Sequence, residues 1–139
     1  MISTARTERV ASKDSPALRI LVVDDEALIR WSLVETLSDS GHEVVAATDA
    51  ESAVRVVTNA AAPFDVALLD FRLPDSNDLT LLSCLRRLAP ATRIIVMTAY
   101  GTPEILQRAL DLGAYSVLNK PFEMSALSPL VTEAHASRF

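Results

Sequence analysis

The feature that most constrains the fold is a short apolar run, Val66-Ala67-Leu68-Leu69, that ends in Asp70. Pro63 precedes this run and Pro74 follows it, so the segment is too short to form a helix. Consecutive apolar residues without alternation are typical of a strand that is buried on both faces of a parallel sheet. The segment therefore predicts a central strand that carries Asp70 at its carboxyl end.

Three further apolar runs also end in polar residues. They are Ile20–Val23 before Asp24 and Asp25, Arg93–Met97 before Thr98, and Tyr115–Leu118 before Asn119 and Lys120. In an open parallel sheet the carboxyl ends of the strands share one edge, and ligands bind there. We therefore expect three carboxylates, a hydroxyl group and an ammonium group to converge at one small site.

The segments between the runs predict helices, because their apolar residues are spaced by threes and fours. The first helix is expected to stop at Gly41 in the manner of a glycine C-cap. Thr48 and Glu51 are expected to form a capping box for the second helix, and Thr102 precedes a proline that begins the fourth. Pro129 lies inside the last pattern, so that helix is expected to begin late or to bend.

Alternating strands and helices predict an α/β fold with a parallel sheet covered on both faces. Five strands with five helices favour a single flavodoxin-like, doubly wound domain with strand order 2-1-3-4-5. Residues 1–17 mix small and charged residues without a period, so we expect a disordered tail there and a folded domain over residues 18–139.

Composition excludes several classes of protein. The net charge of -5 and the lack of a long basic run argue against direct binding of nucleic acid. Cys84 is the single cysteine, which excludes an internal disulfide and a multi-cysteine metal site and fits a reducing compartment. No apolar stretch is long enough to cross a bilayer, and residues 1–17 lack the apolar middle part of a signal peptide. We therefore expect a cytoplasmic protein without a membrane partner.

The residues at the predicted sheet edge have the chemistry of phosphoryl transfer. Asp24, Asp25 and Asp70 would form an anionic pocket that needs a cation or protons at neutral pH, and Mg2+ suits such oxygen ligands. An aspartate can attack phosphorus and hold the product as an aspartyl phosphate. Mg2+, Lys120 and Thr98 would neutralise the phosphoryl oxygens. These residues predict transfer of a phosphoryl group to Asp70.

Each residue also has an ordinary structural role when it is considered alone. An aspartate can cap the next helix, a threonine can close a turn, and a lysine can be solvated. The combination of carboxylates, a hydroxyl group and an ammonium group at the ends of four strands nevertheless favours a phosphoryl-transfer site. A Mg2+-dependent phosphohydrolase of the haloacid dehalogenase type would need a second aspartate where this chain has Glu26. A flavin or nucleotide carrier would need a glycine or hydroxyl loop after the first strand, where acidic residues would repel phosphate.

Four motifs together resemble the receiver domain of bacterial two-component response regulators. Leu21–Glu26 is similar to that family's acidic pair, Asp70–Pro74 to its phosphoacceptor motif, Met97–Ala99 to its switch hydroxyl, and Asn119–Phe122 to its lysine loop. The resemblance covers about Leu18 to Ala136. The sequence of Asp70–Pro74 further resembles that of receivers that precede ATPase and DNA-binding output domains in nitrogen-regulator-type activators.

The resemblance implies the following function. Asp70 accepts a phosphoryl group from a sensor histidine kinase, assisted by Thr98 and Lys120, and Mg2+ is bound by Asp24, Asp25, Asp70 and the backbone carbonyl of Arg72. The Lys120–Pro121 bond is expected to be cis. Such a domain assists its own phosphorylation and dephosphorylation but is not a turnover enzyme.

The partners that the resemblance implies are the kinase and a downstream effector protein or an output domain missing from this chain, with dimerisation on phosphorylation. The alternative function is a receiver-like interaction module that is never phosphorylated.

Three residues depart from the family pattern, namely Val117, Asp78 and the Pro129 noted above. Val117 stands where the family has a tyrosine or phenylalanine that rotates inward when the switch hydroxyl contacts phosphate. Tyr115, expected on the same side of the strand, or Tyr100 could take part of that role. We therefore expect signalling through the helix that follows Thr102 and the loop before it. Asp78 replaces a glycine, and aspartate tolerates such a turn better than most residues.

Overall fold

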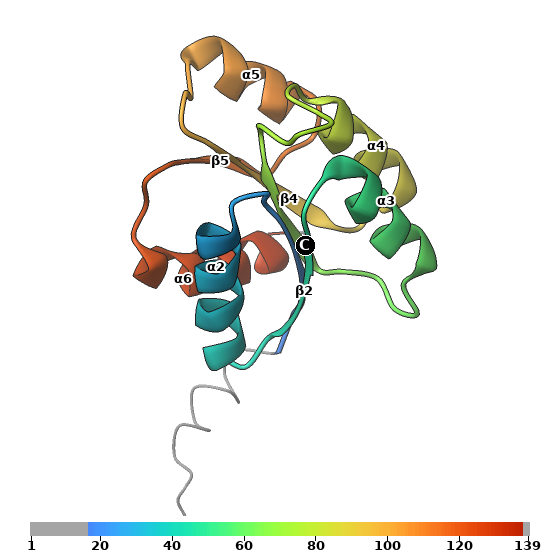
Figure 1. Ribbon diagram of the computed structural model, residues 1–139, viewed down its shortest axis with the longest axis vertical. Coiled ribbons are helices and arrows are strands. Elements are labelled where there is room, and N and C mark those ends of the chain that lie inside the picture. Colours follow the sequence, from blue (N-terminus) through green and yellow to red (C-terminus); the bar gives the residue numbers. More distant parts are fainter. Residues whose placement is uncertain (1–16, 138–139) are drawn as a thin grey trace, which may run out of the picture.

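The computed structural model describes residues 17–137. Its sheet has five parallel strands in the order β2-β1-β3-β4-β5, as predicted. The helices lie in two layers on either side of the sheet (Figure 1). The elements are β1 Arg19–Val23, α2 Ala27–Asp39, β2 Glu43–Ala47, α3 Ala50–Asn59, β3 Val66–Asp70, α4 Thr80–Leu88, β4 Arg93–Thr98, α5 Pro103–Asp111, β5 Ser116–Asn119, a 3-10 turn Met124–Ala126 and α6 Leu127–Ala136.

The strand β3 is the centre of the sheet. All five of its residues are buried, and it pairs with β1 on one side and β4 on the other. Val23 lies opposite Leu69, and Asp70 lies opposite Met97. This register brings the residues that follow β1 to the level of Asp70, so the predicted central strand and its carboxyl-terminal aspartate are confirmed.

Alternating side chains of the central strands form two cores. Leu21 and Leu69 pack on the face covered by α3, α4 and α5, whereas Val22 and Leu68 pack on the face covered by α2 and α6 (Figure 1). Because both faces are covered, the strands can consist almost entirely of apolar residues, and polar groups concentrate at their ends. Within the described residues, no helix combines the length and apolar character that a bilayer crossing requires.

The helix ends largely follow the sequence signals. Gly41 and Gly113 have φ values of 95° and 105°, the left-handed conformation that ends a helix. Thr102 caps α5, and its hydroxyl accepts a hydrogen bond from the Ile105 amide at 3.2 Å. The predicted capping box of Thr48 and Glu51 is wrong, as described next.

The helix α3 begins one residue later than the Thr48 signal implied. Asp49 is therefore the N-cap, and its carboxylate accepts a hydrogen bond from the Ser52 amide at 2.8 Å. Ser52 completes the reciprocal bond by accepting from the Asp49 amide at 3.2 Å. Aspartate is at least as good a cap as threonine, so a shift of one residue costs the helix nothing.

The carboxyl-terminal helix begins at Leu127, two residues before Pro129, in agreement with the late start that this proline predicts. A 3-10 turn precedes α6, and Pro129 is the third residue of the helix, where a backbone amide would have no partner within the helix. The strand β5 starts at Ser116, one residue later than predicted. Residues 1–16 of the predicted disordered tail lie outside the described residues.

Candidate functional site

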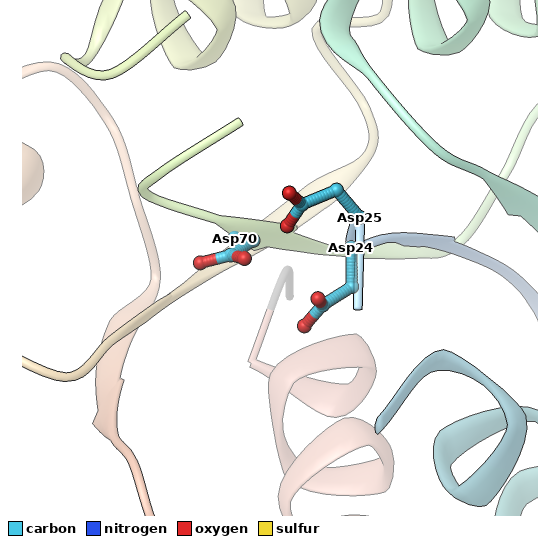
Figure 2. A group of neighbouring side chains, drawn as sticks. All are labelled: Asp24, Asp25 and Asp70. Atoms are coloured by element: carbon cyan, nitrogen blue, oxygen red, sulfur yellow. The ribbon is translucent and has the colours of Figure 1, made fainter. Parts of the chain in front are cut away.

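An acidic cluster lies at the carboxyl edge of the sheet. Asp24 and Asp25 directly follow β1, and Asp70 ends β3, so their carboxylates face a common space (Figure 2). One oxygen of each lies within 4.8 Å of the others. Asp24 and Asp70 are buried, while Asp25 is exposed at the rim. This hard, oxygen-only set suits a divalent cation such as Mg2+ or Ca2+.

The lysine after β5 points into this cluster. The Nζ atom of Lys120 lies 2.9 Å from Asp24 Oδ2, 3.4 Å from Asp70 Oδ2 and 3.8 Å from Glu26 Oε1. Its side chain is only 12% exposed. Burial acts to lower the pKa of Lys120, but the hydrogen bond and charge of Asp24, together with Asp70, outweigh burial and raise the pKa. Lys120 therefore remains an ammonium group between two carboxylates.

The ends of β1, β3 and β4 share one local arrangement. The side-chain oxygen of the polar residue accepts a hydrogen bond from the amide two residues later: Asp24 from Glu26 at 2.9 Å, Asp70 from Arg72 at 3.3 Å, and Thr98 from Tyr100 at 3.0 Å. Such turns fix the side chain relative to its own loop. For both aspartates this bond engages Oδ1, which leaves Oδ2 facing Lys120.

The predicted site residues are thus brought to one edge of the sheet. Thr98 is the last residue of β4, which pairs with β3, and it is buried. The Lys120 amide donates a hydrogen bond to the Thr98 carbonyl at 2.8 Å. The Lys120–Pro121 bond is cis, as the resemblance implies. The role of the Arg72 carbonyl as a metal ligand stays a prediction. The contact of Glu26 with Lys120 was not predicted, because it depends on the turn after Asp24.

The environment of Asp70 raises its pKa to about 6. Burial is the largest cause and the negative charge of Asp24 is the second, while Lys120 and the Arg72 amide act in the opposite direction. At neutral pH most of the population is therefore an anionic carboxylate. Lys120 therefore compensates only in part for the burial of Asp70 and its proximity to Asp24.

Removing this charge is expected to stabilise the metal-free protein. The folded-state pKa of Asp70 is above its ordinary value of 3.8, so folding loses stability as pH rises through this interval, and the full penalty is present above pH 6. In EDTA at pH 7.5, Asp70→Asn is expected to raise the free energy of unfolding by roughly 2 to 3 kcal/mol. At pH 4.5 the gain should be about one third as large.

Urea denaturation at the two pH values measures this difference. Asp111→Asn, which alters an exposed carboxylate on α5, is the control for loss of one negative charge. An Asp70→Asn protein that is less stable than wild type at pH 7.5 in EDTA would contradict the interpretation of the cluster as under-neutralised.

The aromatic residues near the switch threonine differ from the expectation. Val117 packs partly buried on the α3, α4 and α5 face, whereas Tyr115 packs on the opposite face. The prediction that Tyr115 lies on the side of Val117 is wrong. Tyr115 precedes β5, so the alternation of side chains between the two faces of the strand does not extend to it. Tyr100 is 65% exposed, and its ring lies 5.1 Å from the guanidinium carbon of Arg72. The signalling route stays a prediction, which paired structures with and without a phosphoryl analogue would test.

Asp78 acts at the start of the next helix. Its carboxylate accepts a hydrogen bond from the Thr80 amide, the first residue of α4, at 2.9 Å. Hydrogen bonds with Thr80 lower the pKa of Asp78. The aspartate that replaces the family's glycine therefore satisfies a helix amide that a glycine would leave to solvent.

Comparisons with known proteins agree with this geometry. A family model for the response regulator receiver domain matches residues 20–132. The transcriptional regulatory protein PdtaR of Mycobacterium tuberculosis is 38% identical over 124 residues, which are 87% of this chain and 58% of PdtaR. The DNA-binding transcriptional regulator NtrC of Azospirillum brasilense is 36% identical over 118 residues, or 85% of this chain and 24% of NtrC. The chain thus spans only part of each relative.

A solved structure gives the same result for the fold. The crystal structure of a CheY-like response regulator receiver domain protein from Methanospirillum hungatei matches with a TM-score of 0.82 at 30% identity. The match covers 88% of this chain and 96% of that one. The similarity to NtrC agrees with the resemblance of the Asp70 motif to nitrogen-regulator-type receivers.

Proposed function

Because this chain belongs to the response regulator receiver domain family, and is thus a receiver of two-component signal transduction, we propose that Asp70 accepts a phosphoryl group from a sensor histidine kinase with the assistance of Mg2+. The observation that carries the proposal is the position of Asp70 Oδ2. It lies 3.4 Å from the Lys120 ammonium, in a cluster with Asp24 and Asp25. A buried nucleophile beside a fixed positive charge suits a reaction that depends on positioning and charge neutralisation.

The residues of the site would act as follows. A bond forms between an Asp70 oxygen and phosphorus while the bond from phosphorus to the donor nitrogen breaks, and that nitrogen takes up a proton. Asp24, Asp25, Asp70 and the Arg72 carbonyl would hold Mg2+, which supplies positive charge to the phosphoryl oxygens. Lys120 would contact a second phosphoryl oxygen. Thr98 would donate its hydroxyl to a third and move toward Asp70.

The surface beside the site supports a protein as the donor. A mainly apolar pocket of about 310 Å³ adjoins Lys120 and is lined by Glu26, Ile29, Ala99, Lys120, Pro121, Phe122 and Met124. Leu28 and Trp31 on the neighbouring helix α2 are 74% and 61% exposed. Large apolar side chains exposed on a surface are typical of a docking site for a protein partner.

The output of the domain is also part of the proposal. We propose that phosphorylation changes a surface that selects a downstream effector or an output domain, and that the phosphorylated form can dimerise. Because the phosphoryl group ends on the protein's own side chain, the domain assists its own phosphorylation and dephosphorylation without being a turnover enzyme.

Phosphoryl uptake from a small phosphodonor tests the proposed function. The chain is incubated with acetyl phosphate in Mg2+ or in EDTA, and the mass of the intact protein is measured. We expect uptake of one phosphoryl group per chain in Mg2+ and little in EDTA. A folded, Mg2+-binding chain that takes up none would contradict the proposal and would support the alternative, a phosphorylation-independent interaction module.

A further inference from the structure

We propose that Asp75 is a positioning residue for the site: its carboxylate anchors the loop after Asp70 to the start of α3 and thereby sets the position of Arg72 for metal binding. This inference rests on the proposed function. Asp75 itself does not belong to the acidic cluster that could hold a metal.

Both oxygens of the Asp75 carboxylate are engaged. Oδ1 accepts a hydrogen bond from the Ala50 amide at 2.8 Å, and Oδ2 accepts from the Glu51 amide at 3.0 Å. These amides belong to the first turn of α3, where the helix dipole favours a negative charge. Charge-assisted bonds with two donors fix both the distance and the orientation of the carboxylate.

The helix does not need Asp75 as its cap. Asp49 is already the N-cap of α3, and its carboxylate accepts from the Ser52 amide. Asp75 instead binds two first-turn amides that the local cap does not use, and it reaches them from 24 and 25 residues along the chain. The contact therefore constrains the loop that carries Asp75 more than the helix.

This loop is short and internally fixed between Asp75 and the site. Leu73 and Ser76 exchange backbone hydrogen bonds of 2.8 and 3.2 Å, which close a tight turn that contains Asp75. The Leu73 side chain is 6% exposed and packs in the core below α3 and α4, which lie on one face of the sheet (Figure 1). Arg72 directly precedes this turn. A shift of the turn therefore moves the Arg72 backbone, which also donates its amide to Asp70.

Metal sites require ligand positions that are accurate to about half an ångström, and supporting residues outside the ligand set provide this accuracy. Loss of such a partner typically costs 10- to 100-fold in metal affinity or activity. Loss of the Asp75 anchor is expected to raise the dissociation constant for Mg2+ about tenfold.

The experiment compares Asp75→Ala with Asp49→Ala in the full chain. Both variants remove one carboxylate at the start of α3, but only Asp75 belongs to the loop after Asp70. Calorimetric titration with MgCl2 gives the affinity, and urea denaturation in EDTA gives the stability of each variant. Amide hydrogen exchange of residues 72–76 in EDTA reports on the loop without any metal. Asp75→Asn, which keeps one acceptor oxygen, is a milder second variant.

We expect weaker Mg2+ binding and faster exchange of residues 72–76 in Asp75→Ala, an intermediate effect in Asp75→Asn, and wild-type Mg2+ affinity in Asp49→Ala despite its lower stability. Unchanged Mg2+ affinity in Asp75→Ala, or an equal loss in both alanine variants, would overturn the inference. If Asp75→Ala does not fold, the same comparison is made with Asp75→Asn. A wild-type chain that binds no Mg2+ would overturn the proposed function, and this inference with it.

Discussion

Asp70→Asn is expected to abolish Mg2+-dependent phosphoryl uptake from acetyl phosphate. The asparagine side chain has nearly the same shape, so the strand and its buried neighbours should be retained. It lacks the anionic oxygen that attacks phosphorus, and it cannot carry an acyl phosphate. Uptake is measured from the mass of the intact protein, and the modified residue is identified in peptides after trapping of the aspartyl phosphate.

The other two aspartates of the cluster are poorer acceptors for structural reasons. Asp24 is fully buried, and its two carboxylate oxygens bind the Glu26 amide and the Lys120 ammonium at 2.9 Å each. Asp25 is exposed, and among the described residues Lys120 forms no ion pair with it within 4.0 Å. Asp111→Asn is the matched control and should take up phosphate like wild type. Wild-type uptake in Asp70→Asn would show that another residue is the acceptor.

Hydrophobic patterning was sufficient to predict the sheet and the position of the site. Strands buried on both faces consist of apolar runs, so the polar residues that follow each run mark the carboxyl edge of the sheet. Asp24, Asp70, Thr98 and Lys120 were found in this way, and the structure places them together. Such predictions are robust because they depend on burial over a whole segment.

Predictions that depended on a single residue boundary were less reliable. The capping box was assigned to Thr48 although Asp49 is the N-cap, and Tyr115 was placed on the wrong face because β5 begins at Ser116. Several polar residues in a row can each cap a helix, and packing decides among them. The sequence does not contain that packing information in a local form.

The Asp75 anchor shows a second limit. Its partners are backbone amides of α3, which have no residue-specific signal in the sequence, and they lie 24 and 25 residues away. Nothing in the turn-rich segment around Pro74 distinguishes Asp75 from a solvated aspartate. Only the relative position of β3 and α3 in the folded chain brings the two segments together.

Lys120→Met is expected to slow phosphoryl uptake by Asp70 about 10²- to 10³-fold, the usual cost of removing one group that stabilises charge in a transition state. The ammonium group is held between Asp24 and Asp70 before the reaction, at 2.9 and 3.4 Å. Because it is already desolvated, it can contact a phosphoryl oxygen with little reorganisation. Methionine has a similar length and fills the space without the charge.

The same substitution is expected to shift the pH dependence of uptake. Burial and Asp24 raise the pKa of Asp70 and Lys120 lowers it, and the pKa of about 6 is the result of these opposing effects. Without the lysine this pKa should be higher, so the nucleophile becomes protonated at a higher pH, and the fall in rate on the acid side should begin at higher pH than in wild type. Rates of uptake from acetyl phosphate between pH 5.5 and 8 at constant Mg2+ measure the shift.

Lys120→Arg separates charge from geometry. Arginine keeps the positive charge and should therefore leave the pKa of Asp70 near its value in the wild-type protein, but its planar, larger guanidinium does not fit the position of a compact ammonium between two carboxylates. We expect a rate between those of wild type and Lys120→Met, with the acid side of the pH profile unchanged. A loss of only a few fold in Lys120→Met would mean that bound Mg2+ and Thr98 suffice to neutralise the phosphoryl oxygens, and that Lys120 serves mainly to balance the charge of Asp24 and Asp70.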